Sequence, residues 1–411
     1  MKTSIMKWNF WWSNPEKLNE FEWIERDILK STINLMDSPH IKDIIGVRRT
    51  GKTFLMYQLV SYLIKTGVKP EEILYLNFDD PVFKEIKKTI SLALEIKPDI
   101  KYVFLDEIQN IAEWEKEIRV YYDQKEFRQI FVSGSSASLI SRDVGKTLTG
   151  RHLTILVTPF SFKEFISKYN VNYNDPFQKE RVVYYLELFL QEGGFPETLV
   201  EKVVTKEPIL VNTYQDILMR DVVSRFNADP ETTKKLAHYL MTNIGTPFSE
   251  NSISKALNLH NETIKKYLFM LGEVFLFYYV RQFSWKIKVQ VKKDMKCYSI
   301  DTGLRNAVSF KFSDDFGKLA ENIVLTELKR NGQDVYFWKG KKEVDFVIRN
   351  MDKLTAINVA YTDIPHKRET DGLIEFKEKY KDANLVLITK ELEQTDEKHI
   401  KYIPLWKWLL G

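Results

Sequence analysis

The chain is poor in cysteine, and this scarcity excludes two kinds of architecture. Its single cysteine, Cys297, rules out an internal disulfide framework and a zinc cluster built on thiolates. The six histidines are scattered without the spacing of a metal site. Because 44% of the 411 residues are hydrophobic and 29% are charged, the chain can bury real cores and is not disordered.

Long apolar runs and a strong excess of one charge are also missing. No window approaches the about 20 apolar residues that a membrane span needs, and the first 17 residues contain no signal-peptide pattern. We therefore expect a cytoplasmic protein with no membrane partner. The balance of 61 basic against 57 acidic residues gives a net charge of +4. This charge permits contact with nucleic acid but does not argue for it, so any such argument needs a local patch.

Strand and helix patterns alternate from residue 37 to residue 160. This βαβ order predicts an α/β fold with a parallel sheet between helices. The later segments differ, with an α-rich part followed by a second, smaller α/β part. We predict five parts: an N-terminal arm and helix (1–36), a core (37–160), a helical lid or linker (161–229), an α-rich module (230–300) and a C-terminal domain (301–411).

The segment GVRRTGKT, Gly46–Thr53, is a complete phosphate-binding loop motif, and it lies between an apolar strand and a helix. Its glycines let backbone N–H groups curl around phosphate oxygens, and the helix N-terminus favours negative charge. Lys52 supplies a charge near the β- and γ-phosphates, and the Thr53 hydroxyl suits Mg²⁺. The predicted ATP-binding residues are Gly46, Val47, Arg48, Arg49, Thr50, Gly51, Lys52, Thr53 and Phe54.

The segment YVFLDE, residues 102–107, supplies the acids that such a site needs. Four apolar residues predict a buried parallel strand. At its end, Asp106 can hold Mg²⁺, and Glu107 can polarise the attacking water. Without the preceding phosphate loop, the same two acids would be read as a charge pair at a helix N-terminus.

Two further residues are candidates for catalysis. In FVSGSSAS, Ser133 or Ser135 at a strand end could orient the water or the γ-phosphate, and we select Ser135; a serine in a tight glycine turn is the alternative. Arg151, in TGRHLTI, could act as an arginine finger within one chain or between subunits of a homo-oligomer, and the alternative is a surface arginine.

Several segments together resemble a known family. These are GVRRTGKTFL, VFLDEIQNIAEWEKEIR, FVSGSSASLIS, LTGR, PFSFKEF and GGFPE. They are similar to the archaeal and bacterial AAA+-type ATPases of mobile elements, in which an ATPase core precedes a C-terminal domain of unknown function. The resemblance covers nearly the whole chain. In the N-terminal arm the family pattern is closer to Asn-Pro-Trp-Trp, whereas here the tryptophans precede Asn14.

The segment from 251 to 280 predicts helix, turn, helix and strand, followed by a lysine-rich turn. Asn261 is expected to cap the second helix, whose apolar face repeats at helical spacing. A basic turn beside an exposed helix is typical of a winged helix that docks on DNA. The alternative is a winged-helix module that only braces two domains. The predicted DNA-binding residues are Lys265, Lys266, Lys288, Lys292, Lys293 and Lys296.

The last part, with helix, three strands, helix and strand, resembles the restriction-endonuclease-like fold. The resemblance implies an acid on the helix, an acid on the second strand and a Glu-x-Lys on the third. Glu321 and Asp345 match the two acids, whereas Asn358 replaces the glutamate and Ala360 replaces the lysine. With these losses we expect a degenerate nuclease site that does not cut DNA.

These patterns predict an ATP-hydrolysing switch that uses Mg²⁺ and acts on DNA. Two alternatives stay open at this point. One is a Mg²⁺-dependent DNA nuclease that ATP controls, and the other is a regulatory ATPase scaffold that binds a protein partner.

Overall fold

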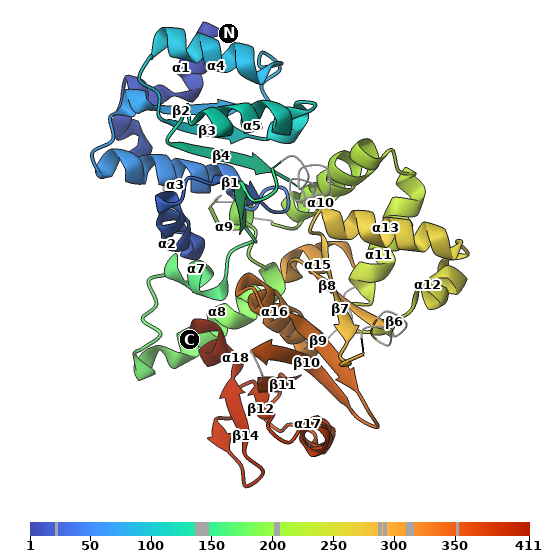
Figure 1. Ribbon diagram of the computed structural model, residues 1–411. Helices are drawn as coiled ribbons and strands as arrows, with labels where there is room; N and C mark the ends of the chain where they lie inside the picture. Colours follow the sequence, from blue (N-terminus) through green and yellow to red (C-terminus); the bar gives the residue numbers. More distant parts are fainter. Residues whose placement is uncertain are drawn as a thin grey trace. The chain divides into compact units, whose positions relative to one another are not determined.

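The computed structural model describes residues 1–20, 24–135, 148–200, 206–286, 290, 294–309, 316–350 and 353–411. These residues form two compact units, 1–158 and 159–411 (Figure 1).

The first unit is built on a five-stranded parallel sheet with the order β2-β3-β4-β1-β5. The strands are β1 (Ile41–Ile45), β2 (Ile73–Asn77), β3 (Tyr102–Asp106), β4 (Gln129–Gly134) and β5 (His152–Leu156). Strands β1, β3 and β4 are buried along their whole length, which is expected for parallel strands covered on both faces. The predicted α/β core with a parallel sheet is confirmed.

Helices surround this sheet and include α2 (Asp27–Asn34), α3 (Lys52–Lys65), α4 (Ile86–Ile96) and α5 (Trp114–Gln124). The apolar side of α3 packs against one face of the sheet, where Ile44, Tyr75, Phe104 and Phe131 are buried. The α-helix that ends the predicted N-terminal part (1–36) is α2, which begins at Asp27.

The N-terminal arm runs from α1 (Lys2–Trp8) to residue 20 and binds the outer edge of β2. The Asn9 amide donates to the carbonyl of Tyr75 at 2.8 Å, and its oxygen accepts the Tyr75 N–H at 2.7 Å. The Trp12 indole donates to the Ile73 carbonyl at 2.8 Å, and Trp11 is fully buried beside it. The arm therefore pairs backbone groups that the edge of the sheet would otherwise expose.

The second unit begins with helices. They are α7 (Phe162–Ser167), α8 (Lys179–Glu192), α9 (Pro196–Val200), α10 (Glu207–Asp216) and α11 (Pro230–Thr242), and a π-helical segment, Ile217–Ser224, continues α10. Next come β6 (Pro247–Phe248), α12 (Glu250–Leu257), α13 (Asn261–Glu273), β7 (Phe277–Gln282) and β8 (Met295–Ser299). Strands β6, β8 and β7 pair in that order, all antiparallel.

The chain then continues through α15 (Thr302–Val308), α16 (Phe316–Arg330), β9 (Val335–Lys339), β10 (Glu343–Asn350), β11 (Lys353–Ala360), α17 (Lys367–Lys379), β12 (Asn384–Thr389), β13 (Gln394–Thr395), β14 (Ile400–Pro404) and α18 (Leu405–Leu410). Because β7 pairs in parallel with β9, a single nine-stranded sheet runs from β6 to β13. The two parts that the sequence patterns separate at residue 300 share this sheet.

The GGFPE and IDTGLRN segments interlock within the second unit. The Asp301 carboxylate accepts the Gly194 N–H at 2.7 Å and caps α15 by accepting the Leu304 N–H at 2.8 Å. A Cβ at Gly303 would lie 1.9 Å from the Glu192 carbonyl oxygen, so the close approach requires glycine. These two motifs therefore join the end of α8 to the start of α15.

Candidate nucleotide site and a buried ionic cluster

The phosphate loop connects β1 to α3 and depends on its glycines. Gly46 has a φ of 149°, and a Cβ there would lie 2.0 Å from the Val157 carbonyl oxygen. Gly51 has a φ of 89° at the start of α3, a conformation that glycine adopts without strain. Arg49 also has a positive φ, 67°. Strained backbone of this kind is often found at ligand sites.

Polar contacts hold the loop in this shape. The Lys52 ammonium donates to the carbonyls of Gly46 at 3.0 Å and Val47 at 3.1 Å, so it lies across the mouth of the loop. Arg26 donates to the Thr50 carbonyl and to the Thr158 carbonyl, both at 2.7 Å. No sequence motif contains Arg26, and the sequence patterns gave no reason to connect it with the loop.

Asp106 lies at the end of β3 and is surrounded by hydroxyl groups. Its Oδ2 accepts hydrogen bonds from Thr53 at 2.5 Å and from the Tyr75 phenol at 2.6 Å, and its Oδ1 accepts one from Ser133. Burial, followed by the negative charge of Glu107, raises the pKa of Asp106, while the hydroxyl donors favour its charged form.

Glu107 follows in a left-handed conformation with φ 53° and ψ 41°. Its N–H donates to the Ser133 hydroxyl at 3.1 Å, and its carboxylate accepts from the Gln109 amide. Ser133 therefore touches both acids, because β4 lies between the loop strand β1 and β3 in the sheet. The selected serine, Ser135, is buried just beyond β4, and Ser133 is the serine that donates to Asp106.

The remaining predicted residues of this unit lie as follows. Phe54 points outward with 49% of its surface exposed. The Arg151 guanidinium donates through Nε to Asp123 Oδ1 at 2.9 Å, so within this chain it is held by an acid.

The set of donors fits a magnesium nucleotide. Hard oxygen ligands are what Mg²⁺ prefers, and a carboxylate and a hydroxyl meet beside the loop at Asp106 and Thr53. Lys52 and the N-terminus of α3 supply the positive charge that phosphate groups need. Thr53 and Asp106 are the residues that would hold the ion.

The predicted DNA-binding lysines fall into three groups. Lys265 and Lys266 are exposed on α13, where they share one face with Glu262 and Phe269. Lys288, Lys292 and Lys293 lie outside the described residues. Lys296 is a correction: only 1% of its side chain is exposed, so it cannot contact DNA in this conformation. Asn261 is also corrected, because it is the first residue of α13 and the residue at the cap position is His260.

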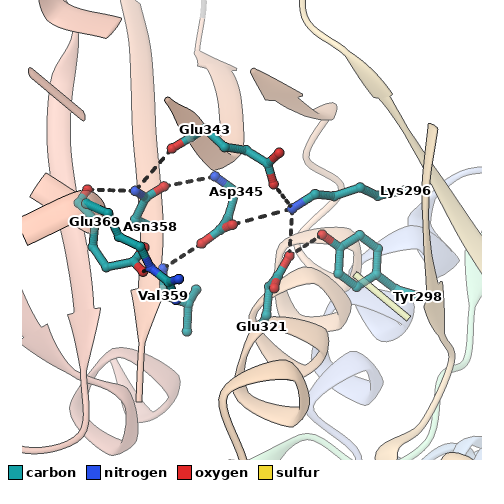
Figure 2. A network of polar contacts seen from close by, with 9 residues as sticks. Lys296, Tyr298, Glu321, Glu343, Asp345, Asn358, Val359 and Glu369 are labelled. Atoms are coloured by element: carbon teal, nitrogen blue, oxygen red, sulfur yellow. Dashed lines mark hydrogen bonds and ion pairs between the residues drawn. The ribbon is translucent and has the colours of Figure 1, made fainter. Parts of the chain in front are cut away.

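Lys296 lies instead at the centre of a buried ionic cluster (Figure 2). Its ammonium, on β8, is 3.0 Å from Glu321 Oε1 on α16. It is 2.8 Å from Glu343 Oε1 and 3.4 Å from Asp345 Oδ1, both on β10. Tyr298 donates to Glu321 at 2.5 Å. The two acids of the predicted nuclease site are therefore brought together, but around a lysine of the chain itself.

The electrostatics of this cluster follow from its charges. Burial alone lowers the pKa of Lys296, but the surrounding carboxylates raise it well above its usual value. Burial and the charge of Glu321 raise the pKa of Asp345 to about 7, although Lys296 opposes the shift. Three carboxylates thus share one ammonium.

Asn358 and Ala360 do not complete this cluster. The Asn358 oxygen accepts the Asp345 N–H at 2.9 Å, and its amide donates to the Glu369 carbonyl at 2.7 Å (Figure 2). Ala360 belongs to the apolar core that includes Leu373 and Phe376 of α17. Both ends of the Asn358 amide are thus held by hydrogen bonds to backbone groups of β10 and α17.

An irregularity in β10 explains why Asp345 and Asn358 point in different directions. Val344 and Val347 both pack into the core beside α17, although residues three apart in a regular strand point to opposite faces. The register of β10 shifts between these two residues, as in a β-bulge. The shift turns Asp345 toward Lys296, while Asn358 faces α17.

Two kinds of feature are absent from the described ranges. No helix there is long and apolar enough to cross a membrane. No group of three or more His, Cys, Asp or Glu residues in this part of the chain is arranged to hold a metal ion.

Comparison with known families matches residues 38–166 to an AAA domain. Residues 184–315 and 316–408 match two domains of unknown function, DUF8612 and DUF4143. An uncharacterized protein of Haemophilus influenzae is 33% identical, covering 93% of this chain and 97% of that protein. An uncharacterized protein of Methanocaldococcus jannaschii is 32% identical, covering 97% and 93%.

Solved structures give weaker likenesses. The Walker-type ATPase of Pyrococcus abyssi is 13% identical with a TM-score of 0.44, covering 70% of this chain and 96% of that chain. AMPPCP-bound DnaA from Aquifex aeolicus is 14% identical with a TM-score of 0.30, covering 60% and 86%. At these TM-scores the likenesses carry no functional argument.

Proposed function

Since the chain belongs to one family with the Haemophilus influenzae and Methanocaldococcus jannaschii proteins and contains an AAA domain, we propose that it binds ATP with Mg²⁺ and hydrolyses it. The observation that carries this proposal is the contact between Thr53, the last residue of the phosphate-loop motif, and Asp106, at the end of β3. These residues are 53 positions apart in the sequence, and their contact supports the proposed site.

Each residue has a separate task in this proposal. The loop N–H groups and Lys52 bind the phosphates, and Lys52 exchanges its carbonyl partners for phosphate oxygens. Bound Mg²⁺ would neutralise the negative charge that develops on the phosphates. Glu107 orients the attacking water and accepts its proton, and Ser133 fixes the backbone that carries Glu107.

Two variants test this assignment. Lys52→Ala should abolish ATP binding, and Glu107→Gln should keep ATP binding but stop phosphate release. Glu113→Gln is a matched control, because Glu113 is an exposed acid in the same unit. If Glu107→Gln and Lys52→Ala both released phosphate at the native rate, the assignment would be wrong. Measuring the rate over a range of chain concentrations also tests whether a homo-oligomer, with Arg151 acting across subunits, is needed.

We further propose that the ATPase acts on DNA through α13. The order α11, β6, α12, α13, β7 and β8, with its antiparallel strands, is compatible with a winged helix and supports this proposal. The exposed face of α13 carries Lys265, Lys266 and Phe269, and Phe269 is 62% exposed. Two lysines can contact phosphates, and an exposed ring can contact a base.

The test of this proposal is salt-dependent DNA binding. Lys265→Glu combined with Lys266→Glu should weaken binding and reduce the slope of log affinity against log salt by about 2, roughly 1 for each lost contact. Lys255→Glu, on the neighbouring helix α12, is the control. Equal DNA affinity in the native chain and the double variant would contradict the proposal. ATP hydrolysis without any DNA affinity would favour a scaffold that binds a protein partner.

We also propose that the C-terminal site does not cut DNA. Its two acids are paired with Lys296, and the side chains of Asn358 and Ala360 lie toward α17 instead. Incubation of plasmid DNA with the protein, ATP and Mg²⁺ or Mn²⁺ should leave the plasmid intact. Cleavage that disappears in Asp345→Ala would establish the ATP-controlled nuclease instead.

A further inference from the structure

Tyr75 makes a contact that the proposed mechanism does not use. Its phenol donates to Asp106 Oδ2 at 2.6 Å, the same oxygen that accepts the Thr53 hydroxyl. Tyr75 lies in an apolar strand, ILYLN, and is fully buried. A valine or leucine would fill such a position without adding a polar atom, so the hydroxyl points to a role beyond packing.

The geometry lets the phenol act on one oxygen of the carboxylate. Strand β2 is the direct neighbour of β3, with Tyr75 opposite Phe104. Ser133 reaches Oδ1 from the other neighbouring strand, β4, while Tyr75 reaches Oδ2. The two hydroxyls hold Asp106 from opposite sides and fix the direction of its carboxylate toward Thr53.

The N-terminal arm in turn holds Tyr75. Asn9 bonds both the N–H and the carbonyl of Tyr75. The Tyr75 ring lies among three aromatic rings, with centroids 5.0 Å from Tyr57, 5.8 Å from Trp8 and 6.3 Å from Trp11. A continuous chain of direct contacts therefore runs from the arm through Tyr75 to Asp106.

We propose that Tyr75 is a positioning residue for the magnesium-binding Asp106, and that Asn9 of the arm fixes the strand that carries Tyr75. This inference rests on the proposed ATP site. It assigns to the arm a part in metal binding, in addition to covering the edge of the sheet. Removing a residue that hydrogen-bonds a metal ligand, without binding the metal itself, typically weakens metal affinity by about 10- to 100-fold.

The test separates nucleotide binding from metal binding. Tyr75→Phe removes only the hydroxyl. We expect ADP to bind native and variant chains equally without metal, as measured by calorimetry. Binding of Mn²⁺ to the ADP complex, followed by electron paramagnetic resonance, should weaken about 10-fold or more in the variant. Asn9→Ala keeps the phenol, and it should weaken Mn²⁺ binding while leaving metal-free ADP binding unchanged.

Trp12→Phe is the matched control, because Trp12 bonds Ile73 of the same strand and not Tyr75. It should bind Mn²⁺ within about twofold of the native chain. Native affinity for Mn²⁺ in Tyr75→Phe, or an equal loss in Trp12→Phe, would overturn the inference and leave the ATP site standing. Failure of the native chain to bind ADP and Mn²⁺ would refute the proposed function itself.

Discussion

Replacing Lys296 by methionine should strongly destabilise the second unit. Methionine fills a similar volume but removes the ammonium that lies 2.8 to 3.4 Å from three carboxylates. Removal of one partner from a buried ion pair typically costs about 3–5 kcal/mol, because the remaining charge loses its compensation. Glu343 is about one third exposed, so its pairing with Lys296 contributes less. We therefore expect the free energy of unfolding to fall by about 3–5 kcal/mol at pH 8, and not by that amount for each of the three carboxylates.

The loss of unfolding free energy in Lys296→Met should increase with pH. Asp345 has a folded-state pKa of about 7, above its ordinary value of 3.8. The folded state therefore binds more protons than the unfolded state between these two values, so this group makes the free energy of unfolding fall as pH rises through that window. Without Lys296 the pKa of Asp345 rises further, and the fall continues above pH 7. The variant should thus lose less stability at pH 5.5 than at pH 8.

Urea unfolding, followed by tryptophan fluorescence and circular dichroism, measures the effect. Lys286→Met is the control, since Lys286 is exposed in the same unit, and it should change stability by less than about 0.5 kcal/mol. Adding Asp345→Asn to the Lys296 variant should recover part of the loss, because one uncompensated carboxylate disappears. A Lys296→Met chain as stable as Lys286→Met at pH 8 would refute the ionic account of the cluster.

Two other predictions concern backbone and site geometry. Gly303→Ala should cost about 3 kcal/mol or more, because its Cβ would lie 1.9 Å from a backbone oxygen. Gly317→Ala in α16 is its control, since no atom lies within 4 Å of a Cβ at that position. This variant should be as stable as the native chain or more stable by up to about 1 kcal/mol. Equal melting temperatures for the two variants would contradict the close contact between the GGFPE and IDTGLRN segments. Asn358→Glu combined with Ala360→Lys should give no metal-dependent nicking of a plasmid, because residue 358 faces α17 and Lys296 still fills the cluster. Nicking by this double variant would show that the site is not closed by Lys296.

The residues of the proposed nucleotide site could be selected from the sequence because their chemistry is local. The phosphate loop places Lys52 and Thr53 in one segment, and the acids follow a single apolar strand. Because the strands are parallel, the carboxyl ends of β1 and β3, where the loop and the acids follow, lie at the same edge of the sheet. The sequence could not decide between Ser133 and Ser135, because the choice depends on which serine lies beside Asp106 when β4 pairs with β3. Tyr75 was missed because it looks like an ordinary strand residue.

In the C-terminal part, the sequence predicted the order of helices and strands correctly but not the contacts of the site residues. The order of helices and strands follows the prediction from α16 to β12. The cationic partner of Asp345, Lys296, however, comes from β8, which the sequence patterns assign to another module. Lys296 was read as part of a basic turn because one arginine and four lysines precede it between residues 281 and 293, and nothing local marks it as buried. Long-range pairing of β7 with β9 decides its environment.

This pairing also gives a reason why the chain keeps an acid whose catalytic partners are absent. A buried carboxylate is stable only with compensation, and Asp345 has Lys296 and the Val359 N–H at 2.9 Å. Replacing Asp345 by an apolar residue would leave the Val359 N–H without its acceptor, whereas replacing it by lysine would add a second positive charge. The acid is thus explained by the ionic contact between β8, α16 and β10, and no cutting activity is required to account for it.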